Sequence, residues 1–346
     1  MNNLFTQTKL DFKLLKQIGK GGEANVFKTH DRQLNSIIAV KKIAAKSLLK
    51  ESEYFEEAKK IYKTRHQNVV PIQYACKDDE SIFIAMPLYK NGSIKSLMDK
   101  RFLTSREIVR YSLQFLAGLN HIHVKGLLHF DIKPGNILIT DSNHAVISDF
   151  GLAAYSGKFG FSKINGTTEV LAPPEFFDQK QHNLKFDIYQ TGLTLYRMCV
   201  GDTIFLNQVK VAHEKKGIMD RTYFIENLKK GKYPETSSYN EHIPIPLRKI
   251  IKRAISTNPD DRYDSVIDLM NDLSAIERAD DWQFETNYTT TEKWTKSIYE
   301  VSASSNGADW EVTSTKKRRN KNDYCGKKLN KSDKKALVYK ALSNDW

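Results

Sequence analysis

Hydrophobic periodicity changes once along the chain, and this change restricts the possible folds more than any other feature of the sequence. Over residues 12–43 apolar and polar side chains alternate as in β-strands, around a glycine-rich break. Apolar stretches at 69–75 and 81–87 predict further strands, and the spacing at 51–63 predicts a helix. From a capping box at 104–107 onward the period is helical. The pattern predicts an α+β protein with a small, strand-rich N-terminal lobe containing one helix, followed by a larger helical lobe.

The helical region extends to about residue 278, where the composition changes. Helices are predicted at residues 186–200, 223–230, 245–256 and 265–277. All four tryptophans lie beyond this point, and residues 316–340 contain eleven basic side chains and two acidic ones. That stretch accounts for +9 of the formal net charge of +13. We expect one domain of two lobes, at residues 12–88 and 89–278. A basic C-terminal extension, partly ordered or docked, is expected at residues 279–346.

Composition excludes several classes of protein. With 40% hydrophobic and 11% aromatic residues, the chain has too much core-forming material to be disordered throughout. No apolar run approaches the ~18 residues of a transmembrane helix, and the N-terminus lacks the pattern of a secretory signal. Three widely separated cysteines predict neither a disulfide framework nor a zinc site. We expect a cytoplasmic protein, or a nuclear one if the basic residues 316–321 are a localisation signal.

A glycine-rich segment interrupts the first strands and reads Ile18-Gly19-Lys20-Gly21-Gly22-Glu23-Ala24-Asn25-Val26. Glycines between strands let backbone N–H groups approach phosphate oxygens, because no side chain intervenes. The same composition occurs in ordinary hairpin turns, and Ala24 replaces the third glycine of the G-x-G-x-x-G pattern. No Walker-type G-K-[ST] sequence follows. The segment is therefore a candidate phosphate-binding loop of a different kind.

The strand Ile38-Ala39-Val40-Lys41 ends in a lysine one hairpin after this loop. Such a lysine is commonly a solvated edge residue, but here its ammonium could reach the α- and β-phosphates of a nucleotide. It would then need an acidic partner, and the following helix offers Glu56 and Glu57. We favour Glu57, because it shares a helix face with Ile61, whereas Glu56 fits the solvent-exposed face.

Two loops on either side of a short apolar hairpin carry the strongest chemical signal, His129-Phe130-Asp131-Ile132-Lys133-Pro134-Gly135-Asn136-Ile137-Leu138 and Ile147-Ser148-Asp149-Phe150-Gly151. Mg²⁺ is commonly held by one or two protein oxygens together with substrate phosphates, so Asn136 and Asp149 would suffice as ligands. Asp131 could then accept a hydroxyl proton, and Lys133 could neutralise charge on the transferred phosphoryl group. The loops therefore predict magnesium-assisted phosphoryl transfer.

These motifs, taken in order, resemble those of the eukaryotic-type (Hanks-type) serine/threonine protein kinase family over roughly residues 12–278. Three later features fit the same resemblance: Pro173-Pro174-Glu175 at the family's A-P-E motif, a helix from Asp187 to Gly192, and Arg262, the expected partner of Glu175. The resemblance implies the two-lobe protein kinase fold, with an antiparallel N-lobe sheet. It also implies ATP and Mg²⁺ as cofactors and transfer of the γ-phosphate to Ser or Thr of protein substrates, including autophosphorylation.

The resemblance also assigns roles to individual residues. It implies nucleotide contacts from the glycine-rich segment and from Ala39, Lys41, Glu57, Met86, Pro87, Tyr89 and Leu138. Within this set Met86 is the gatekeeper, and the backbone at Pro87 and Tyr89 faces the adenine. Lys133 and Gly166-Thr167 are typical of serine/threonine rather than tyrosine kinases. A regulatory column joining the lobes is expected from Ile61, Ile72, His129 and Phe150.

Phe130 departs from the family pattern, because it replaces the arginine of H-R-D. That arginine normally pairs with a phosphorylated residue of the activation segment, so the chain has the pattern of a non-RD kinase. Phosphorylation in that segment is therefore not expected to be the activating switch. The segment nonetheless contains four hydroxyl acceptors, Ser156, Ser162, Thr167 and Thr168.

Two other functions share part of this signal. A pseudokinase or scaffold would bind nucleotide without catalysis, but such proteins usually lack one of Lys41, Asp131 and Asp149, all of which are present. Small-molecule phosphotransferases of the aminoglycoside and choline kinase type have a similar H-x-D-x-x-x-x-N loop. The presence of Lys133, of Glu175 after proline and of Arg262 disfavours that group.

The extension beyond residue 278 allows several interpretations. The run 316–321 could be a nuclear localisation signal, a nucleic-acid patch or a contact for anionic lipid, or simply a solvated charge run in a flexible linker. A partner or anionic surface at residues 316–340 is one hypothesis. A helix is predicted at 332–342, with one face formed by Ala336, Leu337, Tyr339 and Leu342. We also expect Trp282, Phe284, Tyr288, Trp294 and Tyr299 to pack onto the main domain.

Overall fold

The computed structural model describes residues 10–20, 24–44, 55–164 and 167–344. The first lobe is a five-stranded antiparallel sheet with the strand order β1-β2-β3-β5-β4. Its strands are β1 Phe12–Lys20, β2 Ala24–Asp31, β3 Ser36–Ala44, β4 Tyr74–Lys77 and β5 Ser81–Pro87. The strand predicted at 81–87 is confirmed. The strand predicted at 69–75 instead begins at Tyr74, because Val69 and Val70 are buried against the second lobe. There Val69 forms a β-bridge with Ile147, and Val70 N–H donates to the Ile147 oxygen at 2.8 Å.

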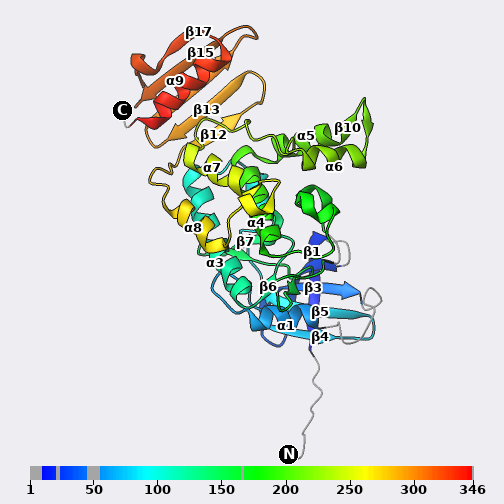
Figure 1. Ribbon diagram of the computed structural model, residues 1–346. Helices are drawn as coiled ribbons and strands as arrows, with labels where there is room; N and C mark the ends of the chain where they lie inside the picture. Colours follow the sequence, from blue (N-terminus) through cyan, green and yellow to red (C-terminus); the bar gives the residue numbers. More distant parts are fainter. Residues whose placement is uncertain (1–9, 21–23, 45–54, 165–166, 345–346) are drawn as a thin grey trace, which may run out of the picture.

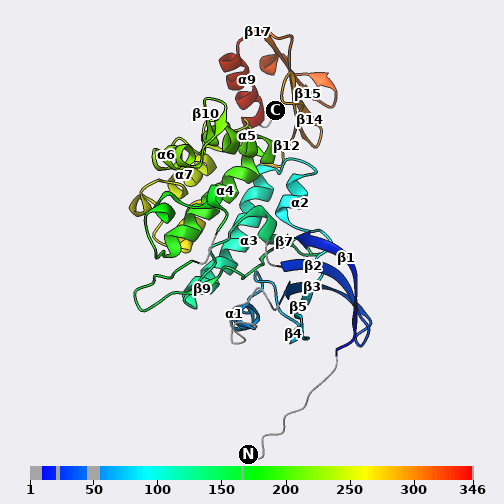
Figure 2. The ribbon, with the colours of Figure 1, turned by 90° about the vertical axis from the view of Figure 1, so that its right-hand side faces the viewer.

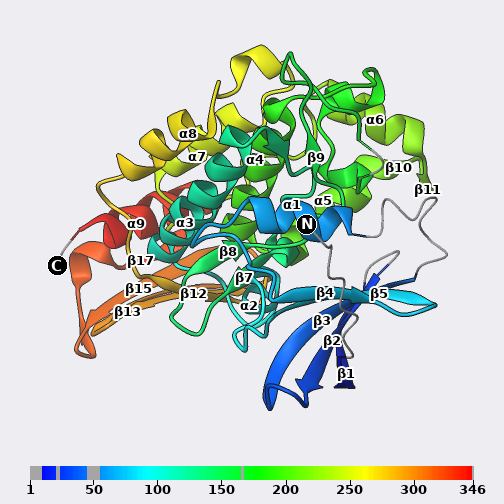
Figure 3. The ribbon, with the colours of Figure 1, turned by 90° about the horizontal axis from the view of Figure 1, so that it is seen from below.

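One helix, α1 (Glu56–Lys63), packs against this sheet, as the helical spacing predicted. Its Ala58 lies in a small core with Ile43, Ile82 and Ile84 of the sheet. Seen from below, α1 lies between strands β4 and β5 and the helices of the second lobe (Figure 3). On that second side Lys60 Nζ donates to the backbone oxygen of Ala153 at 2.6 Å. The helix is thus positioned to couple the two lobes.

The second lobe is mainly helical, as expected. Its helices are α2 Ile94–Met98, α3 Ser105–Val124, α4 Leu184–Val200, α5 Asp202–His213, α6 Arg221–Lys229, α7 Ile245–Ala254 and α8 Val266–Ser274. Short strands form three two-stranded sheets, β6 Leu127–Leu128 with β9 Ala154–Tyr155, β7 Ile137–Ile139 with β8 Ala145–Ile147, and β10 Glu214–Lys215 with β11 Ile218–Met219. Helix α5 and the β10–β11 hairpin were not predicted. None of the helices in the described part of the chain is both long and apolar enough to cross a membrane.

Helices α3 and α4 form the centre of this lobe. The capping box predicted for α3 is present, since Thr104 Oγ1 accepts from Glu107 N–H and the Glu107 carboxylate accepts from Thr104 N–H. Helix α4 is buried along nearly its whole length. It approaches α7 at Gly192, where a Cβ atom would lie 2.5 Å from the Ile255 side chain and 2.8 Å from Ala254 Cβ. Only glycine allows this separation between the helices.

The C-terminal region is a folded unit, so the expectation of a basic, partly ordered extension is wrong. It contains the strands β12 Gln283–Thr286, β13 Thr291–Lys296, β14 Tyr299–Ser305, β15 Trp310–Lys316, β16 Arg319–Asn320 and β17 Gly326–Leu329. The strands form one antiparallel sheet in the order β12-β13-β14-β15-β16, with β17 also pairing with β15. Helix α9 (Lys331–Ser343) covers one face of it (Figure 1). We call residues 279–344 the C-terminal unit.

The core of the C-terminal unit explains why it folds. Alternate residues of the strands point to the helix-covered face, where Trp294, Val301 and Val312 are almost completely buried. Tyr299, Val301 and Ala303 are spaced by two residues, as are Trp310 and Val312. This alternation is a strand signal that the sequence offered, but the density of charge around it favoured an interpretation as a solvated extension. Apolar alternation decides the fold, because each strand needs only one apolar face.

Helix α9 is confirmed close to its predicted bounds, but its buried face differs. The buried residues are Lys334, Val338, Ala341 and Leu342, whereas Tyr339 is 40% exposed. The expectation that the aromatic residues pack onto the main domain holds only in part, for Phe284 and Tyr288, whose rings lie near Phe102. Trp282, Phe284 and Trp294 belong mainly to the core of the C-terminal unit itself.

The C-terminal unit nevertheless contacts the second lobe at a defined junction. Phe284 packs against Phe102 and against His242, with ring centroids 4.9 Å and 5.4 Å apart. The buried Lys334 ammonium bridges Glu292 of β13 and Glu241 of the second lobe. Ser105 Oγ donates to the backbone oxygen of Asp280 at 2.9 Å. The unit lies at the end of the molecule remote from the N-lobe sheet (Figures 1 and 2).

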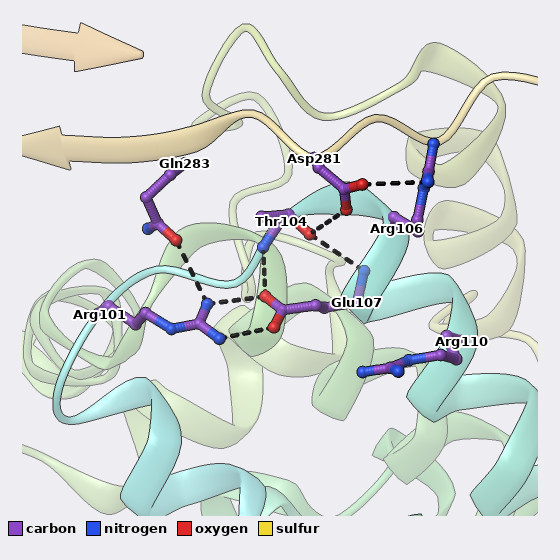
Figure 4. A pocket seen from close by; sticks show the side chains of 7 residues that line it. All are labelled: Arg101, Thr104, Arg106, Glu107, Arg110, Asp281 and Gln283. Carbon is purple, nitrogen blue, oxygen red and sulfur yellow. Dashed lines mark hydrogen bonds and ion pairs between the residues drawn. The ribbon is translucent and has the colours of Figure 1, made fainter. Parts of the chain in front are cut away.

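A polar pocket of about 500 Å³ opens at this junction (Figure 4). Within it Arg101 pairs with Glu107 and also donates to Gln283, and Arg106 pairs with Asp281 at 3.0 Å. The charges of two arginines are thus already balanced by carboxylates. The pocket joins the C-terminal unit to the start of α3 and lies away from the loops singled out for chemistry.

Candidate active site

Lys41 and Glu57 form an ion pair in the structure. Lys41 Nζ lies 2.7 Å and 2.9 Å from the two carboxylate oxygens of Glu57. Strand β3 provides the lysine and α1 the glutamate, so the pair connects the sheet to its helix. The same ammonium lies 2.7 Å from Asp149 Oδ1. Three groups that lie far apart in the sequence therefore meet at one point between the lobes.

The charges at this point stabilise one another. Burial opposes the charge of Lys41, but the carboxylates of Glu57 and Asp149 outweigh it and raise the pKa of the lysine. Desolvation likewise opposes the charge of Asp149, but the charge and the hydrogen bond of the Lys41 ammonium outweigh it and lower the pKa of this carboxyl group. Both groups are consequently charged at neutral pH. A permanently cationic lysine suits the binding of phosphate oxygens.

The loop from His129 to Asn136 brings the other predicted groups together. Lys133 Nζ lies 3.0 Å and 2.8 Å from the two carboxylate oxygens of Asp131. Asn136 Nδ2 donates to Asp131 Oδ2 at 2.7 Å and to its backbone oxygen at 2.9 Å. Asp131 is thus held by both neighbours, and its side chain is almost buried. A carboxylate oriented by these donors can accept a proton from a hydroxyl group placed beside it.

Buried polar side chains of helix α4 hydrogen-bond to the backbone of this loop. Asp187 accepts hydrogen bonds from the backbone N–H groups of His129 and Phe130 at 2.8 Å and 2.7 Å. Gln190 accepts from Ile132 N–H at 2.9 Å, and Thr194 donates to the Ile132 oxygen at 3.2 Å. Gln190 and Thr194 were not predicted as site residues. A signal was present, because residues 187, 190 and 194 are polar and share one face of a helix that is rich in apolar residues.

His123 supports the same carboxylate. Its Nε2 lies 2.7 Å from Asp187 Oδ2. Burial opposes the charge of Asp187, but the contact with His123 and the backbone N–H donors lower the pKa of this carboxyl group. The loop is therefore anchored by the buried Asp187 carboxylate, both of whose oxygens have hydrogen-bond partners.

Two residues of the site have left-handed backbone conformations. Phe130 has φ of 63° and Asp149 has φ of 64°. A non-glycine residue in this region costs of order 1–3 kcal/mol, and such residues are concentrated at functional sites. One of these residues directly precedes Asp131 and the other is Asp149, so both lie at the carboxylates singled out for chemistry.

The oxygen atoms that remain free fit a magnesium site. Lys41 occupies Asp149 Oδ1, but no described residue donates to Asp149 Oδ2 or to Asn136 Oδ1. Asp149 also keeps 43% of its side chain exposed. The described residues contain no cluster of three or more His, Cys, Asp or Glu side chains suited to a metal. Mg²⁺ does not need one, because it usually keeps waters and binds phosphates in addition to one or two side chains.

The residues expected to face a nucleotide line the sheet side of the same space. Val26 lies opposite Lys41 in the β2–β3 pairing and opposite Gly19 in the β1–β2 pairing. A Cβ atom on Gly19 would lie 3.3 Å from Val26 Cβ, so glycine allows the two strands to approach closely here. Lys20 pairs with Asn25, Ile18 is about half exposed and Ala24 begins β2. Gly21, Gly22 and Glu23 lie outside the described residues.

The segment between the lobes follows β5. Met86 lies opposite Ala39, and Pro87 lies opposite Ile38. Tyr89 accepts a backbone hydrogen bond from Gly92 at 3.1 Å. Leu138 is half-buried in β7 and forms a bridge with Ser93. The structure thus pairs β3 with β5 next to Lys41, and the segment that follows β5 reaches β7 through the Ser93–Leu138 bridge.

The predicted column between the lobes has a structural counterpart. The rings of His129 and Phe150 meet edge to face at 5.2 Å. Phe150 and Ile61 are buried in the same core cluster, and Ile72 packs against it. The packing therefore connects α1 to the loops that carry Asp131 and Asp149.

Phe130 is completely buried in an apolar cluster of its own. Its ring meets that of Phe186 at 5.1 Å, and Leu128 and Ala172 complete the buried core of the cluster. Ile164 of the activation segment packs against the same group. The position at which an arginine was expected from the motif thus contributes apolar packing.

The activation segment is also held by polar contacts. Ser156 Oγ donates to the backbone oxygen of Gly126 at 3.0 Å, and Ser162 pairs with His182 through two backbone hydrogen bonds of 2.8 Å. At the end of the segment Arg262 and Glu175 form a bidentate pair with both distances at 2.7 Å. The Arg262 side chain is fully buried. Gly166, the predicted neighbour of Thr167, lies outside the described residues.

Comparison with known proteins agrees with this geometry. The model of the family described as "Protein kinase domain" matches residues 12–272. A probable serine/threonine-protein kinase of Clostridium acetobutylicum is 28% identical over 274 residues, covering 77% of this chain and 40% of the relative. Serine/threonine-protein kinase PknD of Chlamydia trachomatis is 29% identical over 328 residues, covering 82% of this chain and 33% of that protein. The chain thus spans two fifths or less of the length of these curated relatives.

Proposed function

Since the chain belongs to the protein kinase domain family, we propose that it is an ATP- and magnesium-dependent serine/threonine protein kinase. The observation that carries the proposal is the convergence of Lys41, Glu57 and Asp149, at 2.7 Å contacts, next to the Asp131 loop. Burying a charged lysine between two carboxylates costs desolvation free energy, and a lysine held in this way can bind phosphate oxygens. We assign the kinase domain to residues 12–278, with its lobes at 12–88 and 89–278, and the C-terminal unit to the remainder.

The proposed roles use the side chains named above. Lys41 would hold the α- and β-phosphates of ATP, and Glu57 orients the lysine. The adenine lies beside Ala39 and Leu138, with Met86 as gatekeeper and the backbone of Pro87 and Tyr89 facing it. Asn136 and Asp149 hold Mg²⁺, which when bound neutralises phosphate charge.

The acceptor hydroxyl group is placed beside Asp131. This carboxylate takes the hydroxyl proton as the oxygen bonds to the γ-phosphorus. The bond between that phosphorus and the β,γ-bridging oxygen breaks, ADP leaves, and Lys133 stabilises the charge on the transferred group. Asn136 and Lys133 keep the carboxylate in one orientation, so little reorganisation is needed at the moment of transfer. Lys133 supports serine and threonine rather than tyrosine as acceptors.

The finer proposals concern regulation and place. Because Phe130 is buried among apolar side chains, we assign the protein to the non-RD class, whose activation segment does not depend on a phosphate–arginine pair. All three cysteines are free thiols, which supports a reducing compartment and hence the cytoplasm. Protein substrates bind at the cleft, and the basic residues within 316–340 are a separate surface for an anionic partner.

Direct phosphotransfer tests the proposal. The purified chain is incubated with Mg²⁺ and γ-labelled ATP, alone and with generic basic and acidic proteins, and labelled sites are mapped by mass spectrometry. We expect label on Ser or Thr that disappears in Asp149→Ala. Asp141→Ala, which removes an exposed aspartate from the nearby β7–β8 turn, is the matched control and should retain transfer. Nucleotide binding without transfer under all conditions would contradict the kinase assignment and favour a pseudokinase.

A further inference from the structure

A short basic hairpin projects from the C-terminal unit. We define the basic hairpin as Lys316, Lys317, Arg318, Arg319 and Lys321, at the β15–β16 connection. Lys316 pairs with Arg319 across the hairpin, and the backbone N–H groups of Lys317 and Lys321 donate to Ile298 and Ser314, each at 2.9 Å. The five cations are thus fixed on a rigid ribbon rather than spread along a flexible linker.

The turn residues are unusual for their conformation. Lys317 and Arg318 have φ of 48° and 62°, the left-handed pair of values that a two-residue hairpin turn requires. Asn-Gly or Gly-Gly would adopt these angles with less strain. Two cationic side chains therefore occupy the turn at the expense of local stability. Strain retained in this way is typical of positions with a function.

The charges of the basic hairpin are not neutralised within the described chain. None of its five cations forms an ion pair with a described residue, and Lys317, Arg318 and Arg319 are exposed. Three carboxylates elsewhere in the C-terminal unit are already paired, Glu300 with Lys293, Glu311 with Lys327 and Glu292 with Lys334. The hairpin is therefore a concentrated positive potential that lacks its own counter-charge.

Lys340 of α9 extends this surface. Its ammonium lies 5.6 Å from the ring centre of Tyr324, and Tyr324 N–H donates to the backbone oxygen of Lys321 at 2.9 Å. Lys316 lies over Tyr299 in the same manner, at 5.1 Å. Each tyrosine ring thus supports a lysine ammonium. Single-stranded nucleic acids are commonly bound by stacking of unpaired bases on aromatic rings. A ring face that a lysine ammonium already covers is less suited to such stacking.

We propose that the basic hairpin and Lys340 bind the phosphate backbone of double-stranded nucleic acid. A two-stranded ribbon has the dimensions that a duplex groove admits, and Lys and Arg are the side chains that contact phosphates. Membrane insertion would need a cluster of exposed apolar side chains at the tip of the hairpin. Of the large apolar residues that the structure describes beside the turn, only Ile298 is exposed, at 40%. The surface lies on the unit remote from the N-lobe (Figures 1 and 2), so a bound duplex leaves the ATP cleft open.

Salt-dependent binding is the test, measured with the full chain. Fluorescence anisotropy follows a labelled duplex of about 24 base pairs, as DNA and as RNA, between about 50 mM and about 200 mM NaCl. With about five phosphate contacts, log K should fall against log[NaCl] with a slope of roughly −4 to −5. Arg318→Glu/Arg319→Glu should weaken binding at least about tenfold and reduce that slope by about two.

Two further variants separate the surface from net charge. Arg318→Lys/Arg319→Lys keeps the charges and should retain binding within about threefold, because phosphate contacts do not demand a particular cation. Lys125→Glu/Lys252→Glu changes the total charge equally at exposed positions of the kinase domain and should leave affinity nearly unchanged. Asp149→Ala should bind the duplex like the unaltered chain, so loss of catalysis and loss of binding are distinguishable.

Four results would overturn the proposal. They are absence of duplex binding at the lowest salt, equal weakening by the Lys125/Lys252 variant, tighter binding to a single strand of the same length, and binding to vesicles of phosphatidylcholine and phosphatidylserine without binding to the duplex. The last two would reassign the hairpin to unpaired bases or to a lipid surface. Circular dichroism of each variant checks that the C-terminal unit remains folded.

Discussion

At the scale of single residues, the cleft is organised by a few charges that neutralise one another. Lys41 is the centre, since it holds Glu57 and Asp149 at once and thereby sets the distance between β3, α1 and the Asp149 loop. Asp131 depends on a different set of partners, Lys133 and Asn136. Because the two groups share no hydrogen bond, binding of the phosphates and removal of the hydroxyl proton can be tested separately.

Asp131→Asn tests this separation. The amide keeps the shape of the side chain but cannot accept the hydroxyl proton, so turnover should fall by about 10²–10⁴-fold. ATP affinity should change little, because Lys41 and Asp149 are untouched. Steady-state turnover with a protein substrate and equilibrium binding of a fluorescent ATP analogue check the two quantities. Equal losses in both would show that Asp131 supports the nucleotide site rather than the transfer.

At the scale of elements, the activation segment and the residues that follow it are held by interactions that need no phosphate. Ile164 packs against the cluster around Phe130 and Phe186, and the backbone of Ser162 pairs with His182. Beyond the segment, Glu175 is clamped by the buried Arg262. Packing and one ion pair therefore do what a phosphorylated side chain and an arginine do in the family pattern.

Removing acceptors from the segment tests this interpretation. In the triple variant Ser156→Ala/Ser162→Ala/Thr168→Ala, activity should remain within about threefold of the unaltered chain. The reason is that Phe130 replaces the arginine that would bind a phosphorylated side chain. Initial rates of phosphotransfer, before and after phosphatase treatment of the unaltered chain, provide the measurement. A fall of more than about tenfold in both experiments would restore phosphorylation as the switch.

The Arg262–Glu175 pair is expected to contribute far more stability than an exposed one. Arg262→Ala leaves the Glu175 carboxylate without its partner and should lower the free energy of unfolding by about 3–5 kcal/mol. Arg221→Ala, which removes the partner of the exposed Glu169, is the comparison and should leave the free energy of unfolding nearly unchanged, because water and salt screen an exposed pair. Urea unfolding of both variants gives these values, and similar losses would contradict the role of burial.

At the scale of the whole molecule, the C-terminal unit makes the chain larger than a kinase domain alone. Its junction combines the Phe102–Phe284 contact, the Lys334 bridge to Glu241 and the hydrogen bonds at the start of α3. His242 lies within this junction, where burial lowers its pKa to about 4. The junction therefore contains a histidine that stays neutral in the folded chain.

This histidine predicts a pH dependence of stability. Because its pKa in the fold lies below the ordinary value of about 6.5, the unfolded chain binds the proton first as pH falls. Stability from this group is complete above about pH 6.5 and is lost toward about pH 4, by at most about 1.4 kcal/mol per pH unit. Urea unfolding at several pH values should show a shallower loss in His242→Gln than in the exposed control His144→Gln. Identical slopes would exclude His242 as the source.

The amino-acid pattern alone was enough to recognise the two-lobe kinase fold and to single out candidate groups between the lobes. Lys41, Glu57, Asp131 and Asp149 could be recognised because phosphoryl transfer restricts both residue type and order, and the helices of the C-lobe because burial of one face imposes a period. Where the structure describes them, the expected groups do meet between the lobes.

Other features depend on contacts between residues that lie far apart in the sequence. Gln190 and Thr194 support the catalytic loop from a helix some sixty residues away, and no local pattern states which loop they face. The C-terminal strands were missed because a sheet depends on pairing between distant segments, whereas the charges between those segments dominate the local composition. The basic hairpin acquired its position in the same way: the sequence contained its charges, and the pairing of β15 with β16 brought them to one rigid ribbon.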